Sequence, residues 1–333
     1  MTNIDGSMGE GGGQILRTSM ALAALLDEEI TITNIRANRS KKGLRPQHVA
    51  AVRAIAELCG GELEGAFPGS ETLTYRPGHS ELQDYNIEIG TAGSISLVLQ
   101  ACMLAVLHKP KMHLTISGGT NVYYSPSIDY CEYVVLPFLE RMGYRSTLNN
   151  VVRGFHPQGG GLVDITLCPG PLKPLDLRTR GKLIDKGGVC YIQNLPYKIG
   201  EKLKAASGAD IIESTNGVSD GAGVFLYTEY SNTIFGVDAL GRKGLSSENV
   251  GAMGIEAMNK EISSNATLDF FAADQLLPYM CLADGTSYFR VRKLSNHLRT
   301  QMDLLTIFLE VEFKVTEIDN CLEISVSPAA RNQ

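Results

Sequence analysis

One pattern of predicted secondary structure recurs three times along the chain: an amphipathic helix, a strand, a second amphipathic helix and further strands. In the first copy, apolar residues at helical spacing predict helices at 14–26 and 46–58. Alternating or β-branched residues predict strands within 30–33, 63–75 and 85–89. A unit of this kind buries one apolar sheet face beneath two helices, so the repeat strongly limits the folds that the chain can adopt.

The second and third copies keep the same order of elements. In the second copy, the predicted helices and strands lie at 94–107, 112–116, 127–142, 144–152 and 163–167. In the third copy, a helix begins near Asp274 and is followed by elements at 288–291, 297–309, 312–317 and 321–326. Three such units can pack around a common centre and share one core, which predicts an α/β (α+β) fold.

The segment between the second and third copies has a pattern of its own. It contains a predicted strand at 189–192, a helix at 199–206, a hairpin at 223–237 and a helix at 247–262. We therefore predict a large domain formed by residues 1–180 and 265–333, which would carry the catalytic site. Residues 181–264 are predicted to form a smaller inserted α/β domain.

Composition restricts the class of protein. With 44% apolar and 20% charged residues, the chain is typical of a globular protein and not of a disordered one. A formal net charge of −6 gives no overall attraction for nucleic acid, so an anionic ligand would need a local basic patch. The seven cysteines show no CxxC or zinc-like spacing and are interpreted as buried free thiols, which suits a reducing cytoplasm. Since no signal sequence or long apolar span is visible, the protein is predicted to be soluble, cytoplasmic and without a membrane partner.

A glycine-rich loop leads directly into the first predicted helix, with the sequence Gly9-Glu10-Gly11-Gly12-Gly13-Gln14. Glycines allow backbone N–H groups to approach an anion, and the N-terminus of the following helix adds a favourable dipole. The loop is not a Walker motif, because no Gly-Lys-Ser/Thr follows it. Glu10 is a hard oxygen ligand suited to Mg²⁺ or Mn²⁺ beside phosphates. The alternative is a tight turn that carries a solvated glutamate.

Basic side chains are concentrated in residues 36–48, which contain no acidic residue. They are Arg36, Arg39, Lys41, Lys42, Arg45 and His48. Pro46 marks the first turn of the helix that follows this segment. Arginine binds phosphate through two parallel hydrogen bonds, so this density in an acidic protein predicts a phosphate-binding loop. A solvated charged surface is the alternative.

Two further candidates lie at helix starts in the third copy. His297 follows Ser295 and Asn296, either of which can cap the helix. The helix dipole there favours a neutral imidazole, which can act as a nucleophile or base. Asp274 could orient an imidazole or bind a metal, and it could equally be a helix cap. A structural or merely exposed histidine is the alternative for His297.

The repeat links these candidates. Gln14 and Gln275 occupy equivalent positions at the start of the first helix in copies one and three. His48 and His297 occupy equivalent positions at the start of the second helix. If the copies pack about a pseudo-symmetric axis, these helix ends are expected to converge on one cleft.

The same residues make the chain resemble the RNA 3′-terminal phosphate cyclase family. The resemblance covers nearly the whole chain, in the family's order. Its motifs are Asp5-Gly6, Gly9 to Arg17, Ile35 to Arg39, Gly43 to His48, Gly93-Ser94, Leu97 to Gln100, Ser117 to Thr120, Gly154-Phe155, Gly159 to Gly161, Ala273 to Gln275 and His297-Leu298. The resemblance implies three units of two helices on a four-stranded sheet, packed in one large domain, plus a smaller inserted domain.

The resemblance also implies a reaction that consumes ATP and acts on RNA with a 3′-terminal phosphate. The histidine at position 297 would attack the α-phosphate of ATP to form histidine–AMP. AMP would then pass to the RNA 3′-phosphate, and the 2′-hydroxyl would expel it to leave a 2′,3′-cyclic phosphate. Glu10 and Asp274 would hold a divalent metal (Mg or Mn), and Arg17, Arg36, Arg39 and Arg45 would stabilise phosphate charge.

By the same resemblance, a set of residues forms the ATP site: Gln14, Gln100, Pro126, Phe271, Ala272, Ala273, Asp274 and Gln275. Phe271 and Pro126 would enclose the adenine. Gln47 and His48 are assigned with Arg45 to the part of the cleft that binds RNA phosphate. Contact with RNA is predicted to be shallow, mainly at the terminal nucleotide, so binding should weaken little with added salt.

The chain departs from the family at a few positions. Asn296 and Gln301 stand where bacterial members often have Cys and Asn, and Phe271 stands where tyrosine is common. Tyr123-Tyr124 after Gly-Gly-Thr is unlike many bacterial members. Two alternative functions are compatible with the fold. A related ribosome-assembly branch binds RNA without cyclase activity, but it lacks the nucleophilic histidine. Enolpyruvyl transferases contain similar repeated units but give a histidine nucleophile no role. The oligomeric state is left open.

Overall fold

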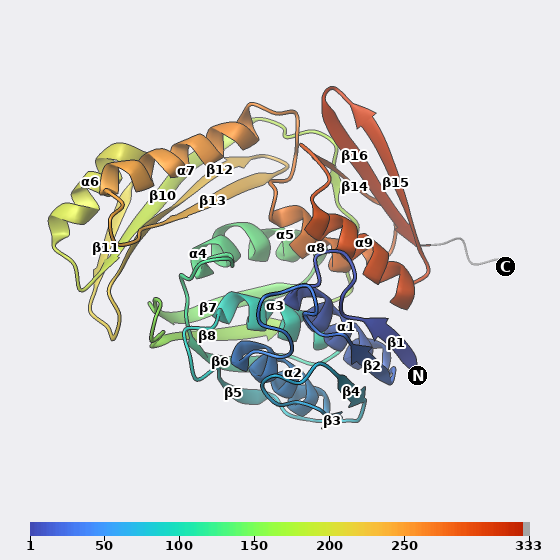
Figure 1. Ribbon diagram of the computed structural model, residues 1–333. Helices are drawn as coiled ribbons and strands as arrows, with labels where there is room; N and C mark the ends of the chain where they lie inside the picture. Colours follow the sequence, from blue (N-terminus) through green and yellow to red (C-terminus); the bar gives the residue numbers. More distant parts are fainter. Residues whose placement is uncertain (329–333) are drawn as a thin grey trace.

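The computed structural model describes residues 1–328 and contains three four-stranded sheets of matching topology, each packed against helices (Figure 1). The first sheet has the strand order β1-β2-β4-β3, where β1 and β2 are parallel and the other pairs are antiparallel. The elements of this unit are β1 (Thr2–Asp5), α1 (Gly13–Leu26), β2 (Ile30–Thr33), α2 (Pro46–Cys59), β3 (Glu62–Glu64) and β4 (Leu73–Arg76).

The second sheet repeats this order as β5-β6-β8-β7. Its strands are β5 (Asp84–Glu88), β6 (Met112–Gly118), β7 (Arg145–Val152) and β8 (Gly161–Cys168). Its first helix is α3 (Ile95–Ala105). The second helix is continuous but changes its hydrogen-bond pattern, as α4 (Ile128–Tyr130), the π-helical segment η1 (Cys131–Val135) and α5 (Leu136–Met142).

The third sheet has the order β15-β16-β14-β9. Its elements are β9 (Asp176–Leu177), α8 (Ala272–Cys281), β14 (Ser287–Val291), α9 (Asn296–Phe308), β15 (Val311–Ile318) and β16 (Cys321–Pro328). The prediction of three repeated units of helices on four-stranded sheets is therefore confirmed.

The structure corrects where each unit begins. Every unit starts with a strand that pairs in parallel with the second strand, so its order is strand, helix, strand, helix, strand, strand. The predicted strand at 85–89 is not the end of the first copy, because β5 pairs with β6 and opens the second sheet. The leading strands β1 and β9 have only four and two residues, too few for an alternating pattern to identify them.

A fourth sheet interrupts the third unit between β9 and α8. Its strand order is β11-β10-β12-β13, and α6 packs against α7 over it (Figure 1). The elements are β10 (Leu183–Gln193), α6 (Tyr197–Ser207), β11 (Ile211–Thr215), β12 (Gly221–Tyr230), β13 (Ile234–Leu240) and α7 (Ser247–Ile262). This part has a separate hydrophobic cluster that includes Cys190, Leu203 and Val224. We call β10 to α7 the inserted part below.

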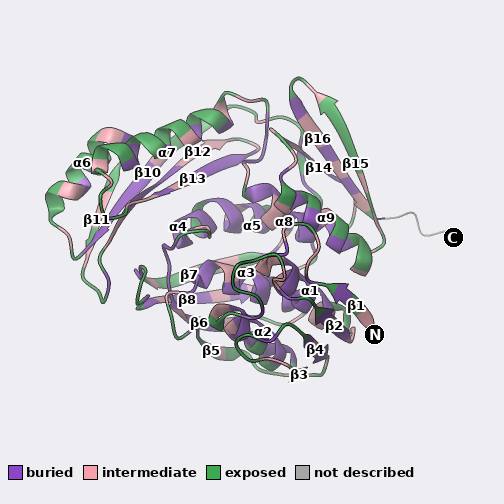
Figure 2. Cartoon of the chain, in the orientation of Figure 1, coloured by how far each residue is buried: buried purple, intermediate pink, exposed green. Residues whose placement is uncertain are grey.

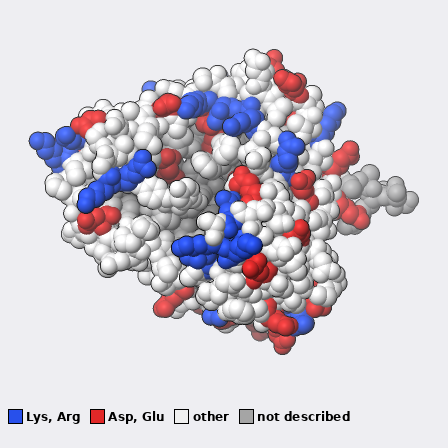
Figure 3. All heavy atoms as spheres, viewed as in Figure 1, with Lys and Arg blue, Asp and Glu red and all other residues white. Residues whose placement is uncertain are grey.

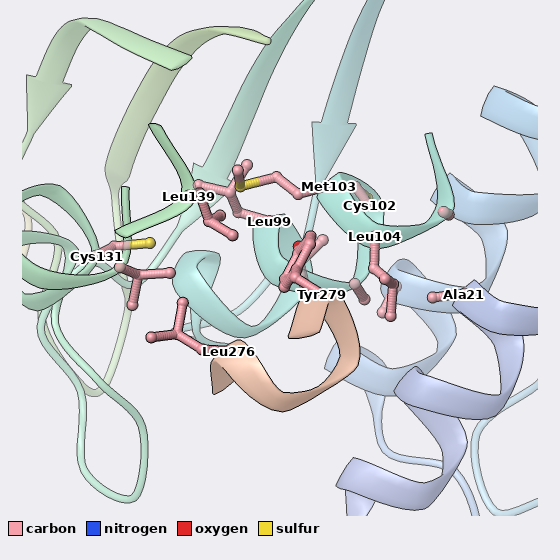
Figure 4. Close-up of a cluster of buried hydrophobic side chains, with 14 of the residues drawn as sticks. Ala21, Leu99, Cys102, Met103, Leu104, Cys131, Leu139, Leu276 and Tyr279 are labelled. Atoms are coloured by element: carbon pink, nitrogen blue, oxygen red, sulfur yellow. The ribbon is translucent and has the colours of Figure 1, made fainter. Parts of the chain in front are cut away.

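The helices of the three units share one core. Figure 4 shows Ala21 of α1, Leu99 of α3, and Leu276 and Tyr279 of α8 in the same buried cluster. The buried helix faces point inward, whereas α6 and α7 carry exposed residues on their outer side (Figure 2). Because α1 packs against both α3 and α9, helices from all three units are in contact.

A buried arginine joins the inserted part to the second unit. Arg153 donates to Asp129 Oδ1 at 2.7 Å and to Glu213 Oε1 of β11 at 2.9 Å. Its guanidinium also lies 4.8 Å from the centre of the Tyr191 ring. Since a buried guanidinium is stable only when it is paired, these contacts hold the inserted part against the repeats. Among residues 1–328, no helix is long and apolar enough to cross a membrane.

Candidate active site

A cavity of about 580 Å³ lies between the helix starts of the three units and the inserted part. Ala239 and Met253 of the inserted part form one side of it. Figure 3 shows the hollow on this face, with Lys and Arg side chains on either side of it. The volume is within the range of pockets that bind ligands the size of a nucleotide. Eight residues singled out from the sequence line it: Gln14, Arg17, Gln100, Pro126, Phe271, Asp274, Gln275 and His297.

His297 presents an accessible imidazole to this cavity. It lies in the first turn of α9, which the Ser295 hydroxyl caps by accepting from the Leu298 N–H at 2.9 Å. Its Nε2 lies 3.0 Å from Glu10 Oε2, and its Nδ1 lies 3.7 Å from Asp274 Oδ2. The side chain is 43% exposed. The imidazole therefore experiences two carboxylates, one near each ring nitrogen, in addition to the helix dipole that the sequence predicted.

The glycine-rich loop brings Glu10 to His297 across 287 positions of sequence. Gly9 and Gly11 have φ angles of 50° and 56°, a region that glycine occupies without strain. Gln14, at the start of α1, donates from Nε2 to the backbone carbonyl of His297 at 3.4 Å. The first and third units thus meet at the imidazole. Of the four positions that the repeat was expected to bring to one cleft, Gln14, Gln275 and His297 line the cavity, whereas His48 lies outside its lining.

Asp274 lies in the first turn of α8, and its side chain is largely buried, with 15% of its surface exposed. Its Oδ1 has no hydrogen-bond partner among residues 1–328. Burial, with a contribution from the charge of Asp269, raises the pKa of Asp274 to about 7, and Arg17 partly opposes this. Burial also lowers the pKa of Arg17 to about 10, so that arginine stays charged at neutral pH.

The carboxylates fit a divalent cation only together with a phosphate ligand. Within the described part of the chain, no group of three or more His, Cys, Asp and Glu side chains is arranged to hold a metal. Glu10 and the unpaired oxygen of Asp274 are each available beside His297. Mg²⁺ is commonly held by one or two carboxylates, with phosphate oxygens and water completing the shell. This donor set suits such a site.

A second set of donors meets beside Gly13. The backbone N–H of Arg45 donates to His48 Nδ1 at 3.1 Å, so the ring proton of the neutral imidazole is on Nε2. A Cβ atom placed on Gly13 would lie 2.5 Å from His48 Nε2 and 2.9 Å from Arg17 Nη1. A neutral N–H donor and a guanidinium therefore converge at the start of α1, where an oxyanion would also meet the helix N-terminus.

Arginines of the β2–α2 loop extend this set. Arg39 Nη2 lies 3.4 Å from Glu10 Oε2, which links the loop to the carboxylate beside His297. Arg36 has a φ of 59°, and its buried Nε has no acceptor within residues 1–328. Burial lowers the pKa of Arg36, and the neighbouring charges of Arg39 and Arg45 add to this effect. An anion at this position would relieve that repulsion.

The other predicted residues divide between the cavity and its surroundings. The Gln100 amide donates to the Gln275 side chain in the cavity wall. Gln47 packs against Gly93, near but outside the cavity lining. The side chains of Ala272 and Ala273 are buried in the main core and do not line the cavity. They belong to the face of α8 that packs on the other helices, which a motif match alone cannot reveal.

Two aspartates that the sequence did not single out shape the site. Asp269 accepts hydrogen bonds from the Tyr130 hydroxyl at 2.6 Å and from the N–H groups of Phe271 and Gly236, at 2.9 and 3.0 Å. It therefore orients the start of α8, the capping role that was open for Asp274. Asp238 of the inserted part also lines the cavity and accepts from the Ser127 N–H at 2.9 Å. An aspartate three residues before a helix start was the available signal for Asp269.

Gln301, one of the departures from the family pattern, also has a defined place. It is buried in α9, and its Nε2 donates to Thr18 Oγ1 of α1 at 3.2 Å. This bond fixes α9 against α1 one turn beyond His297. The substitution therefore maintains the contact between the two helices that carry His297 and Arg17.

The environment of His48 leads to a prediction about stability. Burial and, after it, the charges of Arg17, Arg36 and Arg45 lower its pKa to about 3, compared with about 6.5 for an exposed histidine. Between these values the unfolded chain binds more protons, so the free energy of unfolding should fall as the pH is lowered. From pH 7.5 to 5, His48 is expected to contribute a loss of about 2 kcal/mol.

Urea denaturation at both pH values would measure this loss in the wild type and in His48→Gln. The glutamine variant should lose about 2 kcal/mol less than the wild type over this range. His108→Gln, which changes an exposed histidine, should behave as the wild type. Equal losses in wild type and His48→Gln would contradict a buried neutral imidazole.

Comparison with known proteins agrees with the family resemblance. The model of a family described as RNA 3′-terminal phosphate cyclase matches residues 8–315. The chain is 39% identical to a protein of that name from Nitrosospira multiformis, over 98% of this chain and 97% of the relative. It is 39% identical to one from Methanosarcina mazei, over 98% and 100% of the two chains, and 40% identical to one from Pyrobaculum neutrophilum, over 94% of each.

Proposed function

Since this chain belongs to the RNA 3′-terminal phosphate cyclase family, we propose that it uses ATP to convert an RNA 3′-terminal phosphate into a 2′,3′-cyclic phosphate. His297 is the proposed nucleophile. One observation carries the proposal: an accessible imidazole in the wall of a nucleotide-sized cavity, with a carboxylate near each ring nitrogen. This arrangement supports an enzyme over an RNA-binding relative that lacks the histidine.

In the first step, the lone pair of His297 Nε2 attacks the α-phosphorus of ATP. A P–N bond forms, the bond to the bridging oxygen breaks, and pyrophosphate leaves with the electron pair. Asp274 is placed to hold the proton on Nδ1, which leaves the lone pair on Nε2, and to stabilise the positive charge of the ring. Glu10, now 3.0 Å from Nε2, has to move aside.

Glu10, with Asp274 as a second candidate ligand, would hold a divalent cation. When bound, the cation supplies charge neutralisation at the phosphate oxygens. The glutamate is well placed for this because Arg39 also contacts it. Arg17, which also lines the cavity, adds positive charge.

The remaining two steps take place at the RNA end. An oxygen of the RNA 3′-phosphate attacks the phosphorus of the histidine-bound AMP, the P–N bond breaks, and His297 regains its lone pair. The RNA 2′-hydroxyl then attacks the terminal phosphorus, loses its proton, and AMP leaves with the electron pair of the broken P–O bond. The last step is effectively unimolecular, because the 2′-oxygen is already adjacent. Donors from Arg17, His48, Arg36, Arg39 and Arg45 are proposed to hold the terminal phosphate.

The adenine of ATP is proposed to lie between Phe271 and Pro126. Both residues line the cavity. Phe271 is half exposed, so its ring is available for stacking. Phe271 is itself supported edge-on by Tyr130, with ring centres 6.2 Å apart. Gln100 and Gln275, which are bonded to each other in the cavity wall, would contact the ribose or phosphates.

The proposal is tested by incubating the protein with a 3′-phosphorylated oligoribonucleotide, ATP and Mg²⁺. The expected product is an end that resists phosphatase, formed with one AMP and one pyrophosphate per cyclised RNA. A substrate with a 2′-O-methyl group on its last nucleotide should stop at the RNA–adenylate, because the final nucleophile is blocked. Release of ADP, or an unchanged RNA end with folded protein, would contradict the proposal.

A further inference from the structure

Tyr124 stands out as an exposed aromatic side chain at the edge of the cavity. Its relative exposure is 103%, the highest among the large hydrophobic residues of the described chain. It lies in the loop between β6 and α4, two residues before Pro126, and it contributes to the cavity lining. An aromatic ring left wholly in water gains no stability from burial, so its position calls for a different explanation.

The backbone of Tyr124 is also in an unusual conformation. Its φ angle is 64°, in the left-handed region that is strained for a bulky residue. The loop around it is held in place, because the Tyr123 hydroxyl donates to the Gly241 carbonyl at 2.6 Å and the Ser125 hydroxyl donates to the Val122 carbonyl at 3.0 Å. Within residues 1–328, the Tyr124 hydroxyl has no such bond, and its ring is only tilted toward Tyr123, with centres 6.5 Å apart. Strain of this kind persists where surrounding contacts impose it, frequently at binding sites.

A cationic side chain, that of Arg242, lies close to the neighbouring Tyr123. Tyr123 is bonded to Gly241, and Arg242 and Lys243 follow directly in the β13–α7 loop. Lys and Arg side chains occur on both sides of the hollow in Figure 3. An exposed aromatic beside cations at the entrance to a cleft is the arrangement that single-stranded nucleic acids use, because bases stack on the ring while cations contact the phosphates.

We propose that Tyr124 is a stacking platform for a nucleobase of the RNA strand close to its 3′ end. The inference rests on the proposed function, in that RNA is taken as the substrate. RNA is favoured over ATP as the source of the base, because the adenine of ATP is assigned to Phe271 and Pro126, whereas Tyr124 is fully exposed at the edge of the cavity. This platform would position the terminal nucleotide without sequence preference, since every base has a stacking face.

The absence of tryptophan from the sequence allows a direct binding test. Tyr124→Trp, combined with His297→Ala to prevent turnover, places a single fluorophore at the platform. Titration with a short 3′-phosphorylated oligoribonucleotide should quench its fluorescence saturably, because a base stacks on the indole, whereas ATP alone should not. Tyr197→Trp in the same background, at an exposed position on α6, should show no quenching. RNA binding seen by anisotropy without quenching, or quenching by ATP alone, would overturn the proposal.

Kinetics provide a second test in a variant that should fold without strain. Tyr124→Gly removes the ring and suits the positive φ angle. It should raise the KM for RNA about tenfold and change the rate of histidine–AMP formation from ATP much less, whereas Tyr124→Phe should match the wild type. Tyr197→Ala is the matched control. A KM within twofold of wild type for Tyr124→Gly would overturn the proposal.

The two proposals fail in distinguishable ways. A wild type that binds RNA but never cyclises it would contradict the proposed function, and the fluorescence titration would still decide whether a base stacks on Tyr124. If the wild type is fully active and Tyr124→Gly has the wild-type KM for RNA, only the proposed stacking platform would be contradicted.

Discussion

Replacing His297 with alanine is expected to reduce covalent labelling of the protein by ATP labelled at the α-phosphate by at least about 10⁴-fold. Among residues 1–328, His113 also has a carboxylate near each ring nitrogen, but His297 is the histidine that lines the cavity. The measurement is protein-bound label after incubation with ATP and Mg²⁺ in the absence of RNA. The wild-type label should be labile in acid and stable in alkali, as expected of a histidine phosphoramidate.

Two controls make the result specific. His79→Ala changes a histidine whose side chain is 84% exposed, and it should label as the wild type does. Equilibrium binding of ATP to His297→Ala should be retained, which would show that the loss lies in bond formation and not in binding. Labelling of His297→Ala at the wild-type rate would exclude His297 as the nucleophile and move the proposal to another residue.

Replacing Glu10 with glutamine is expected to lower the rate of histidine–AMP formation by about 10²- to 10³-fold. The variant keeps the size of the side chain and removes the charge that is proposed to hold the cation. Its neighbours are His297 Nε2 at 3.0 Å and Arg39 Nη2 at 3.4 Å, so the carboxylate is also placed to orient the imidazole. A titration with Mg²⁺ separates these two roles.

If Glu10 holds the cation, Glu10→Gln should need a higher Mg²⁺ concentration for half-maximal rate, and excess Mg²⁺ should recover part of the activity. The control is Glu64→Gln, which changes a glutamate whose side chain is 75% exposed on β3. This control should show the wild-type Mg²⁺ dependence. A Glu10→Gln variant that is slow but has an unchanged Mg²⁺ dependence would show that the carboxylate acts only on His297.

Much of the fold could be predicted because its helices and long strands carry local periodic signals. The helix predicted at 46–58 is α2 (Pro46–Cys59), and the helix predicted at 297–309 is α9 (Asn296–Phe308). The leading strand of each unit escaped prediction or was assigned to the wrong unit. A strand such as β5 shows the same alternation whichever sheet it joins, and only its pairing with β6 decides between them.

The candidate site was predictable in its residue types more than in its contacts. His297 at the start of the last helix and Glu10 in the glycine-rich loop were both predicted to be catalytic residues. The repeat indicated that helix starts of different units would converge. The sequence did not reveal that Asp269, and not Asp274, accepts the N–H groups at the start of α8. It also did not reveal Asp238, because that residue comes from the inserted part, whose packing against the repeats leaves no local signal.

The sequence by itself determined the local structures: the repeated helices and strands, the positive-φ glycines of the loop, and a histidine in the first turn of a capped helix. These depend on interactions between residues near in sequence, such as the Ser295 cap on α9. Only the tertiary structure decided that Glu10 and Asp274 lie beside the two nitrogens of His297, and that Tyr124 projects beside the cavity. The physical reason is that these placements follow from how three units and an inserted sheet pack together, which joins residues up to 287 positions apart.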